Sequence, residues 1–189
     1  MYFLRQTDLR FNLGIMMVIW MVTLYNYTLI QFLVNTFESI YPSAIASSIS
    51  DIIGYLIGGW LFYKLGIRVS LGVSFCVSIV GAILVTLVGF RHESSWIFPI
   101  LVTIAKLGIS IVYQVIYVAH PTVFPTLFAA TAFGLVQFVS NLFSMIAPAV
   151  AENSEEPIPM LSFMFLSALG GGLLLFLREG TGSVATSKF

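Results

Sequence analysis

Charged residues are scarce in this sequence. They make up only 8% of its 189 residues, while 59% are hydrophobic and the mean hydropathy is +1.01. A soluble domain needs far more charge on its surface, so this composition excludes that class. The eight lysines and arginines are balanced by eight aspartates and glutamates. Because this balance provides no basic face, we expect no nucleic-acid partner.

The residues that carry most enzyme and metal chemistry are also few. The single cysteine, Cys76, lies in an apolar run, so an internal disulfide is excluded. His92 and His120 add two further metal ligands, which is too few for an ordinary metal site. No glycine-rich phosphate loop is present, and serines such as Ser110 lack a matched base on a neighbouring run. We expect no enzymatic activity, no metal and no cofactor.

Long apolar runs are what the sequence has in abundance. A helix needs about 20 apolar residues to cross the hydrocarbon core of a bilayer, and six runs reach or approach that length. Short segments with proline, glycine or charge separate the runs, which do not alternate as barrel strands do. The sequence predicts an all-α polytopic membrane protein with a six-helix membrane domain at 13–177. The predicted spans are 13–34, 44–65, 69–88, 96–118, 126–149 and 160–177, with tails at 1–12 and 178–189.

The basic residues predict how these spans are oriented. With six spans both termini lie on one side, and that side receives six of the eight basic residues. The opposite side receives only Arg91, and Lys106 lies inside a span. Since basic loops stay inside, we expect both termini in the cytoplasm, or in the matrix of a mitochondrion. The six residues are Arg5, Arg10, Lys64, Arg68, Arg178 and Lys188.

The stretch from Asp51 to Arg68 carries a recognisable pattern. Gly54 and Gly58 form a small-residue face that lets a neighbouring helix approach closely. Gly66 permits a tight turn, and Arg68 anchors that turn at the membrane interface. An acidic helix that leads to a short loop with glycine and arginine resembles the signature of the major facilitator superfamily.

Two further stretches resemble the organic cation and anion transporters of that superfamily. The residues from Tyr113 to Thr126, with Pro125 and Thr126 at the end, look like their Glu-Leu-Tyr-Pro-Thr-x-x-Arg stretch. The first span is similar to their seventh helix. The resemblance implies one half bundle of the major facilitator type, corresponding to the six C-terminal helices only. We interpret the chain as a complete short product, with a fragment of a twelve-helix transporter as the alternative.

The departures from the family pattern concern charge. The acid expected before the Leu-Tyr-Pro-Thr segment falls on Thr122, and the arginine expected after it falls on Ala129. In the fifth span, the position seven residues before Pro148 is often charged in these transporters, and here it is Asn141. The charges that the resemblance implies for gating and substrate binding are therefore missing.

Asp51 and Lys106 are the ionisable side chains well inside the spans. Intramembrane charge is costly and is a functional hypothesis by default, so the pair could form an ion relay or bind a charged substrate. The alternative is a structural role, either as an ion pair or through separate polar partners. Because the other family charges are absent, we favour the structural role and leave the pairing open.

Uncharged polar side chains gather on the first and fifth spans. They either line a cavity for an organic solute or form hydrogen bonds between helices, which stabilise a membrane bundle by about 1 kcal/mol or less each. We weigh these alternatives evenly for Tyr27 and Gln31, and favour structural hydrogen bonding for the others. The candidates are Tyr25, Tyr27, Gln31, Gln137 and Asn141.

Three functions follow from a six-helix chain of this kind. Alternating access requires two bundles around a site, and six helices supply one. We favour a non-transporting accessory subunit whose partners are lipids and other membrane proteins. The alternatives are a half-size organic-ion transporter, working as a dimer or with a separate N-terminal half, and a transporter fragment. We expect the mitochondrial inner membrane, because large energy-transducing assemblies are natural hosts for such a subunit.

Overall fold

The computed structural model describes residues 7–35, 40–89, 97–124, 126–153 and 158–176. Within these ranges every regular element is a helix and there is no strand, as the apolar runs predict. The elements are α1 (Thr7–Asn35), α2 (Ile40–Gly89), α3 (Ile97–Val123), α4 (Thr126–Ser144), α5 (Ile146–Asn153), α6 (Ile158–Leu173) and the short 3₁₀ helix η2 (Leu174–Phe176).

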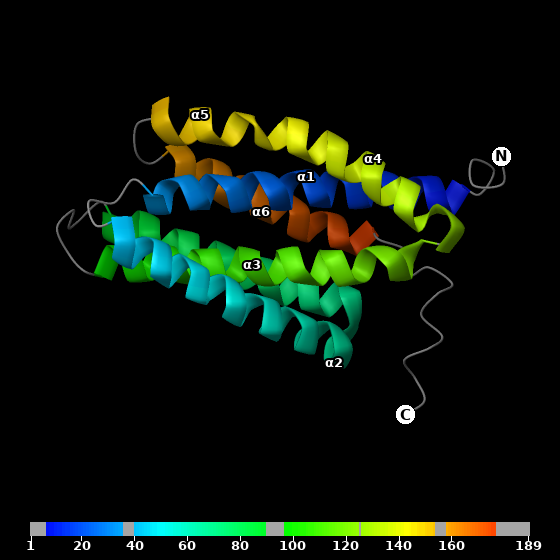
Figure 1. Cartoon of the computed structure of the whole chain (residues 1–189), viewed down its shortest axis with the longest axis horizontal. Helices are drawn as coiled ribbons and strands as arrows, with labels where there is room; N and C mark the ends of the chain where they lie inside the picture. Colours follow the sequence, from blue (N-terminus) through cyan, green and yellow to red (C-terminus); the bar gives the residue numbers. More distant parts are fainter. Residues whose placement is uncertain (1–6, 36–39, 90–96, 125, 154–157, 177–189) are drawn as a thin grey trace.

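The helices form an elongated bundle around α1. Figure 1 shows the long helices lying roughly along one axis, with α4 and α5 on one side of α1 and with α2 and α3 on the other. The central helix contacts every other helix from α2 to α6. Many of its apolar side chains are accordingly inaccessible, including Met16, Ile19, Trp20, Leu29 and Ile30.

The described residues contain five helices long and apolar enough to cross a membrane, where six were expected. The difference arises because the expected spans 44–65 and 69–88 belong to the single element α2, which is interrupted by a non-helical residue. Gly66 lies inside α2 with φ 75° and ψ 178°, a left-handed conformation that favours glycine. The backbone at Gly66 is not helical, so α2 consists of two helical arms joined at this residue.

The two arms of α2 nevertheless run in opposite directions. A Cβ atom built on the glycines of this region would collide with the facing helix, which identifies the residues in closest contact. Where the first arm of α2 contacts α3, the residue numbers of the two helices increase in the same direction, so these helices are parallel. Where the second arm contacts α3, the residue numbers increase in opposite directions, so that pair is antiparallel. The arms are therefore antiparallel. The contacts are Gly54 with Ser110, Gly58 with Gln114, Ser78 with Gly108 and Gly81 with Ala105.

Several other helix ends differ from the predicted spans. Helix α1 begins at Thr7, so residues 7–12 of the expected N-terminal tail are helical. Helix α3 continues past residue 118 and through Pro121 to Val123. The run 126–149 is divided between α4 and α5, because Pro148 has no N–H with which to bond the carbonyl of Ser144. The expected C-terminal tail, 178–189, lies outside the described residues.

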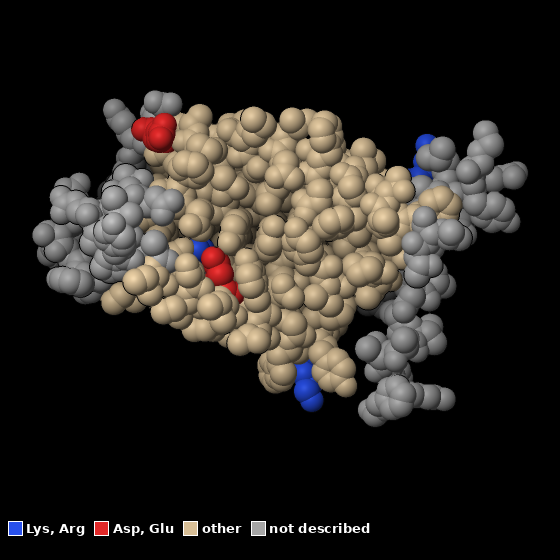
Figure 2. Space-filling view, in the orientation of Figure 1, with Lys and Arg blue, Asp and Glu red and all other residues tan. Residues whose placement is uncertain are grey.

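The outer surface of the bundle is largely uncharged. The candidate spans are Arg10–Val34, Ser47–Leu87, Ile100–Val123, Phe128–Glu152 and Ile158–Phe176. Figure 2 shows that charges on the visible face lie at its edges, apart from one red and blue patch surrounded by uncharged atoms. Large apolar side chains cover most of the exposed helix surface, as expected of helices in contact with lipid.

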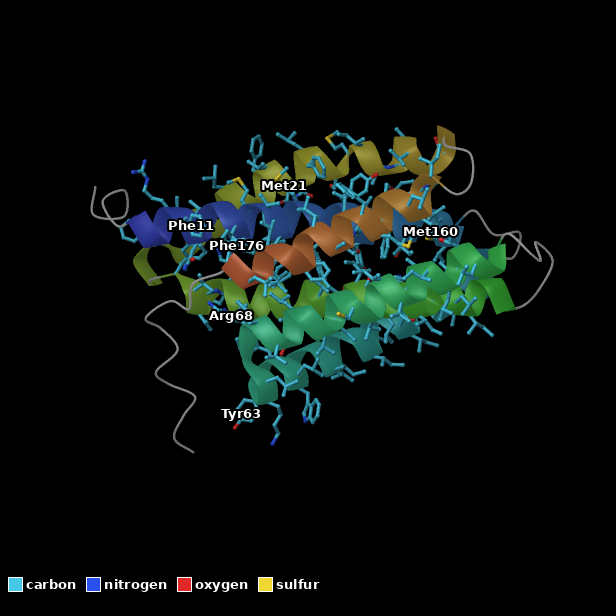
Figure 3. The ribbon with its side chains drawn as sticks, turned by 180° about the vertical axis from the view of Figure 1, so that it is seen from behind. Phe11, Met21, Tyr63, Arg68, Met160 and Phe176 are labelled. Carbon is cyan, nitrogen blue, oxygen red and sulfur yellow. The ribbon has the colours of Figure 1, made fainter. Side chains whose placement is uncertain are left out.

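Both terminal helices reach the same end of the bundle. Figure 3 shows Phe11 of α1, Phe176 of η2 and Arg68 near the bend of α2 toward one end. Met160, near the start of α6, lies toward the opposite end. The ends of the described chain and the bend at Gly66 thus lie toward one end of the bundle.

Candidate functional site

A buried lysine is the centre of the main polar cluster. The side chain of Lys106 on α3 is 0% exposed, although it lies inside a candidate span. Its Nζ donates to Oε1 of Gln31 at 2.7 Å, to the carbonyl oxygen of Ser47 at 3.2 Å and to Oδ2 of Asp51 at 3.0 Å. It also contacts Oγ of Ser47. The ammonium therefore connects α3 with α1 and α2.

The carboxylate of Asp51 has several donors around it. Ser110 Oγ donates to Oδ1 at 2.7 Å, and the hydroxyl of Tyr27 donates to Oδ2 at 3.1 Å. With Lys106 on Oδ2 as well, both oxygens of the carboxylate are satisfied. The side chain is 18% exposed, so one edge of the carboxylate remains accessible from outside the bundle.

Tyrosine rings cover the cluster on one side. The ring of Tyr27 stacks on Tyr113 with centroids 5.0 Å apart and an interplanar angle of 18°. The Tyr27 hydroxyl lies 3.5 Å from the hydroxyl of Tyr55, and its ring centroid lies 5.7 Å from Nζ of Lys106. That distance is within the range of a cation–π contact. These rings separate the ammonium from the lipid without removing all access to Asp51.

Whether Asp51 and Lys106 pair was left open by the sequence, and in the structure they do. Asp51 and Lys106 are 55 residues apart and form a salt bridge of 3.0 Å. A buried charge pair is tolerated only when hydrogen bonds satisfy its remaining groups, and this condition is met here. The expectation that Ser110 lacks a base on a neighbouring run is wrong, since its hydroxyl donates to the carboxylate of Asp51 on α2. Ser110 is itself buried and its proton faces that carboxylate, so the pair offers no accessible nucleophile.

A second polar group, which we call the α3–α4 polar surface, consists of Tyr113, Tyr117, Gln137 and Asn141. Gln137 Nε2 donates to the Tyr117 hydroxyl at 2.8 Å, and that hydroxyl lies 3.2 Å from the Tyr113 hydroxyl. Asn141 donates only back to the carbonyl of Gln137, at 2.8 Å. All three of these hydrogen bonds lie at the exposed surface of the bundle.

The predicted polar candidates therefore do not share one face. Tyr27 and Gln31 join the charged cluster, while Gln137 and Asn141 belong to the α3–α4 polar surface. Tyr25 is buried and its hydroxyl lies 3.5 Å from Ser162 Oγ on α6. The five polar candidates named from the sequence therefore take part in three separate sets of contacts.

The residues of the family-like loops have separate positions. Gly66 forms the bend of α2, and the side chain of Arg68 is exposed just beyond it. Pro125 lies outside the described residues, and Thr126 is the first residue of α4. Neither Gly66 nor Arg68 lies in the charged cluster, so Gly66 acts by shaping the bend of α2.

Three members of the charged cluster are absent from the sequence-based candidates. Ser47 and Tyr55 lie four residues on either side of Asp51, and Ser110 lies four residues after Lys106. Residues four apart share a helix face, so polar residues at this spacing within an apolar run could have identified all three.

No family model matches this chain. The resemblance to one half of a major facilitator transporter therefore rests on the residues between Asp51 and Arg68 and on those between Tyr113 and Thr126. Function has to be argued from the contacts of the charged cluster and of the α3–α4 polar surface.

Proposed function

We propose that this protein is an integral membrane subunit that does not transport by itself. It packs through the α3–α4 polar surface against another membrane protein within a larger complex. The observation that carries the proposal is the exposure of amide and hydroxyl groups on helices that are otherwise apolar enough to span a membrane.

The exposed polar groups need a partner other than lipid. Tyr117 is 37% exposed and Asn141 is also exposed, both within candidate spans. The Tyr117 hydroxyl and Asn141 Nδ2 are hydrogen-bonded within the bundle, but Asn141 Oδ1 accepts no hydrogen bond from the described residues. Hydrocarbon would leave that oxygen unsatisfied, which costs free energy. Apart from Thr131, the other exposed side chains described on α4 are apolar, including Leu135, Phe138 and Leu142. A protein partner on the polar edge and lipid on the apolar edge would satisfy both kinds of surface.

The charged cluster supports a structural role. Lys106 is fully buried, and its positive charge is compensated by Asp51 at 3.0 Å. Substrate binding by either group would require this contact to break inside a low-dielectric environment, which is costly. The cluster accordingly holds α1, α2 and α3 together and leaves no free charge to bind an organic ion.

The architecture supports one half of a transporter-type bundle. In our proposal the two antiparallel arms of α2 cross the membrane separately, which gives six crossings and resembles a half bundle of the major facilitator type. One bundle supplies only one wall of an alternating-access site. The proposed location is the mitochondrial inner membrane, whose large assemblies suit an accessory subunit.

A second candidate function has one observation in its favour. Asp51 retains 18% exposure next to the rings of Tyr27 and Tyr55. A carboxylate beside tyrosine rings suits a cationic organic solute. On this alternative the chain is a half-size organic-ion transporter that works as a dimer or with a separate N-terminal half.

A photo-cross-linking residue at Asn141 is expected to capture a protein partner in the native membrane. The same residue at Leu135 is the matched control, since it lies on α4 about 120° around the helix and faces the apolar sector. We expect a discrete heavier band from position 141 and lipid adducts from position 135, both detected by mass spectrometry. Equal capture of protein at both positions, or lipid alone at both, would contradict the proposal.

Uptake measurements separate the two candidate functions. Vesicles that contain only this chain should not accumulate labelled organic cations or anions, because a second bundle is absent. Saturable uptake that is lost in the Tyr27→Phe variant would support the half-size transporter instead.

The proposed topology predicts labelling from opposite sides. In a Cys76→Ser background, Lys64→Cys should react with an impermeant thiol reagent only from the side of the termini. Glu152→Cys, at the other end of the bundle, should react only from the opposite side. Both native side chains are exposed, so reagent access is not limited by burial. Labelling of both positions from one side would show that the assignment from basic residues is wrong.

A further inference from the structure

We infer that the oxygen atoms around Lys106 form a binding site for a small monovalent cation of ammonium or potassium size, which the chain fills with its own lysine. The inference concerns a ligand site inside the bundle and is independent of the proposed partner on the α3–α4 polar surface.

The site has the ligand chemistry of a cation site. Four oxygens face Nζ of Lys106: the amide oxygen of Gln31, the carbonyl and hydroxyl oxygens of Ser47, and the carboxylate of Asp51. Carboxylate, amide and backbone carbonyl oxygens are the groups with which proteins hold hard cations, potassium included. We call these four atoms the oxygen cage.

The oxygens match both the donors and the charge of the ammonium. Three residues, Gln31, Ser47 and Asp51, accept from its three N–H groups, and Asp51 supplies the compensating negative charge. The ring of Tyr27, centred 5.7 Å from Nζ, adds a further attraction that depends on positive charge.

The cage and its occupant come from different helices. Gln31 lies on α1, Ser47 and Asp51 lie on α2, and only the ammonium comes from α3. Shortening Lys106 therefore leaves the oxygens in place and creates a buried space with one uncompensated negative charge. A buried carboxylate without a counter-charge is strongly unfavourable, so that space should draw in a cation from solution.

The test is the thermal unfolding midpoint of purified Lys106→Ala in detergent at constant ionic strength. Methylammonium and potassium chloride should raise the midpoint saturably by about 2–4 °C or more, because a ligand stabilises the state that binds it. Tetramethylammonium chloride, too large for the space, should have no such effect. The wild-type midpoint should be the same in all three salts, since its own lysine occupies the cage.

Two further variants keep the inference testable. Lys106→Ser is three atoms shorter than lysine, leaves the cation position free and keeps a polar group near the oxygens, so it should also respond to potassium. The double variant Lys106→Ala/Asp51→Asn lacks the negative charge and should lose the response. An equal effect of tetramethylammonium would overturn the inference. So would an absent response in both single variants, or a response retained in the double variant.

Discussion

Replacing Asp51 with asparagine should destabilise the folded bundle by about 3–5 kcal/mol, the usual cost of breaking a buried ion pair from one side. The substitution keeps the shape of the side chain but removes its charge. Lys106 would remain 0% exposed with no counter-charge, and its only other oxygen ligands are neutral. Neutral oxygens reduce but do not cancel the cost of a buried ammonium.

A double variant distinguishes the loss of a charge pair from the loss of packing. The double variant Asp51→Asn/Lys106→Met removes both charges while it keeps an apolar stem of similar volume. Replacing a whole buried pair is often neutral or stabilising, so the double variant should recover most of the stability lost in the single variant. The free energy of unfolding of the wild type, Asp51→Asn, Lys106→Met and the double variant can be compared by denaturant titration in mixed micelles. A double variant as unstable as the sum of both single changes would show that the pair is not coupled.

The second large effect is expected at the contact between α2 and α3. A Cβ atom at Gly108 would lie 2.5 Å from the backbone nitrogen of Ser78 and 2.7 Å from its Cα. Backbone atoms cannot rotate out of the way, so Gly108→Ala must move α3 away from the second arm of α2. We expect a loss of about 1–3 kcal/mol or more in the free energy of unfolding, as for other overpacked cores.

A matched control shows whether the loss comes from this contact. Gly72 is also helical and lies on the second arm of α2, but a Cβ there would have no atom within 4 Å. Gly72→Ala should therefore unfold at or slightly above the wild-type midpoint. If Gly108→Ala and Gly72→Ala behave alike, the close approach of α2 and α3 is not needed for stability.

Some of the charged cluster could be predicted from single residues. Asp51 and Lys106 stand out because charge in an apolar run is costly, and Tyr27 and Gln31 because polar groups there need partners. Ser47, Tyr55 and Ser110 did not stand out, since single hydroxyl groups are common in membrane helices. Their contribution depends on lying four residues from a charge, on the same helix face.

The sequence by itself determined that the chain is helical, that several of its helices are long and apolar enough to cross a membrane, and that a tight turn falls at Gly66. The break before Pro148 was not predicted, although its cause is equally local. Apolar runs of membrane length leave the backbone no alternative to helix in a bilayer. Gly66 and Pro148 act locally, through φ and a missing N–H, so their effects need no distant partner.

Only the tertiary structure decided which helix faces meet. Helix periodicity shows that Ser47, Asp51 and Tyr55 share a face, but it does not show that this face meets Lys106 on α3. That meeting depends on the bend at Gly66 and on glycines along α2 and α3, which allow the backbones to touch. The same packing turns Tyr25 toward α6 and Tyr27 toward Asp51, although they are two residues apart. Neighbours on one helix point to different partners, and only the arrangement of the whole bundle assigns those partners.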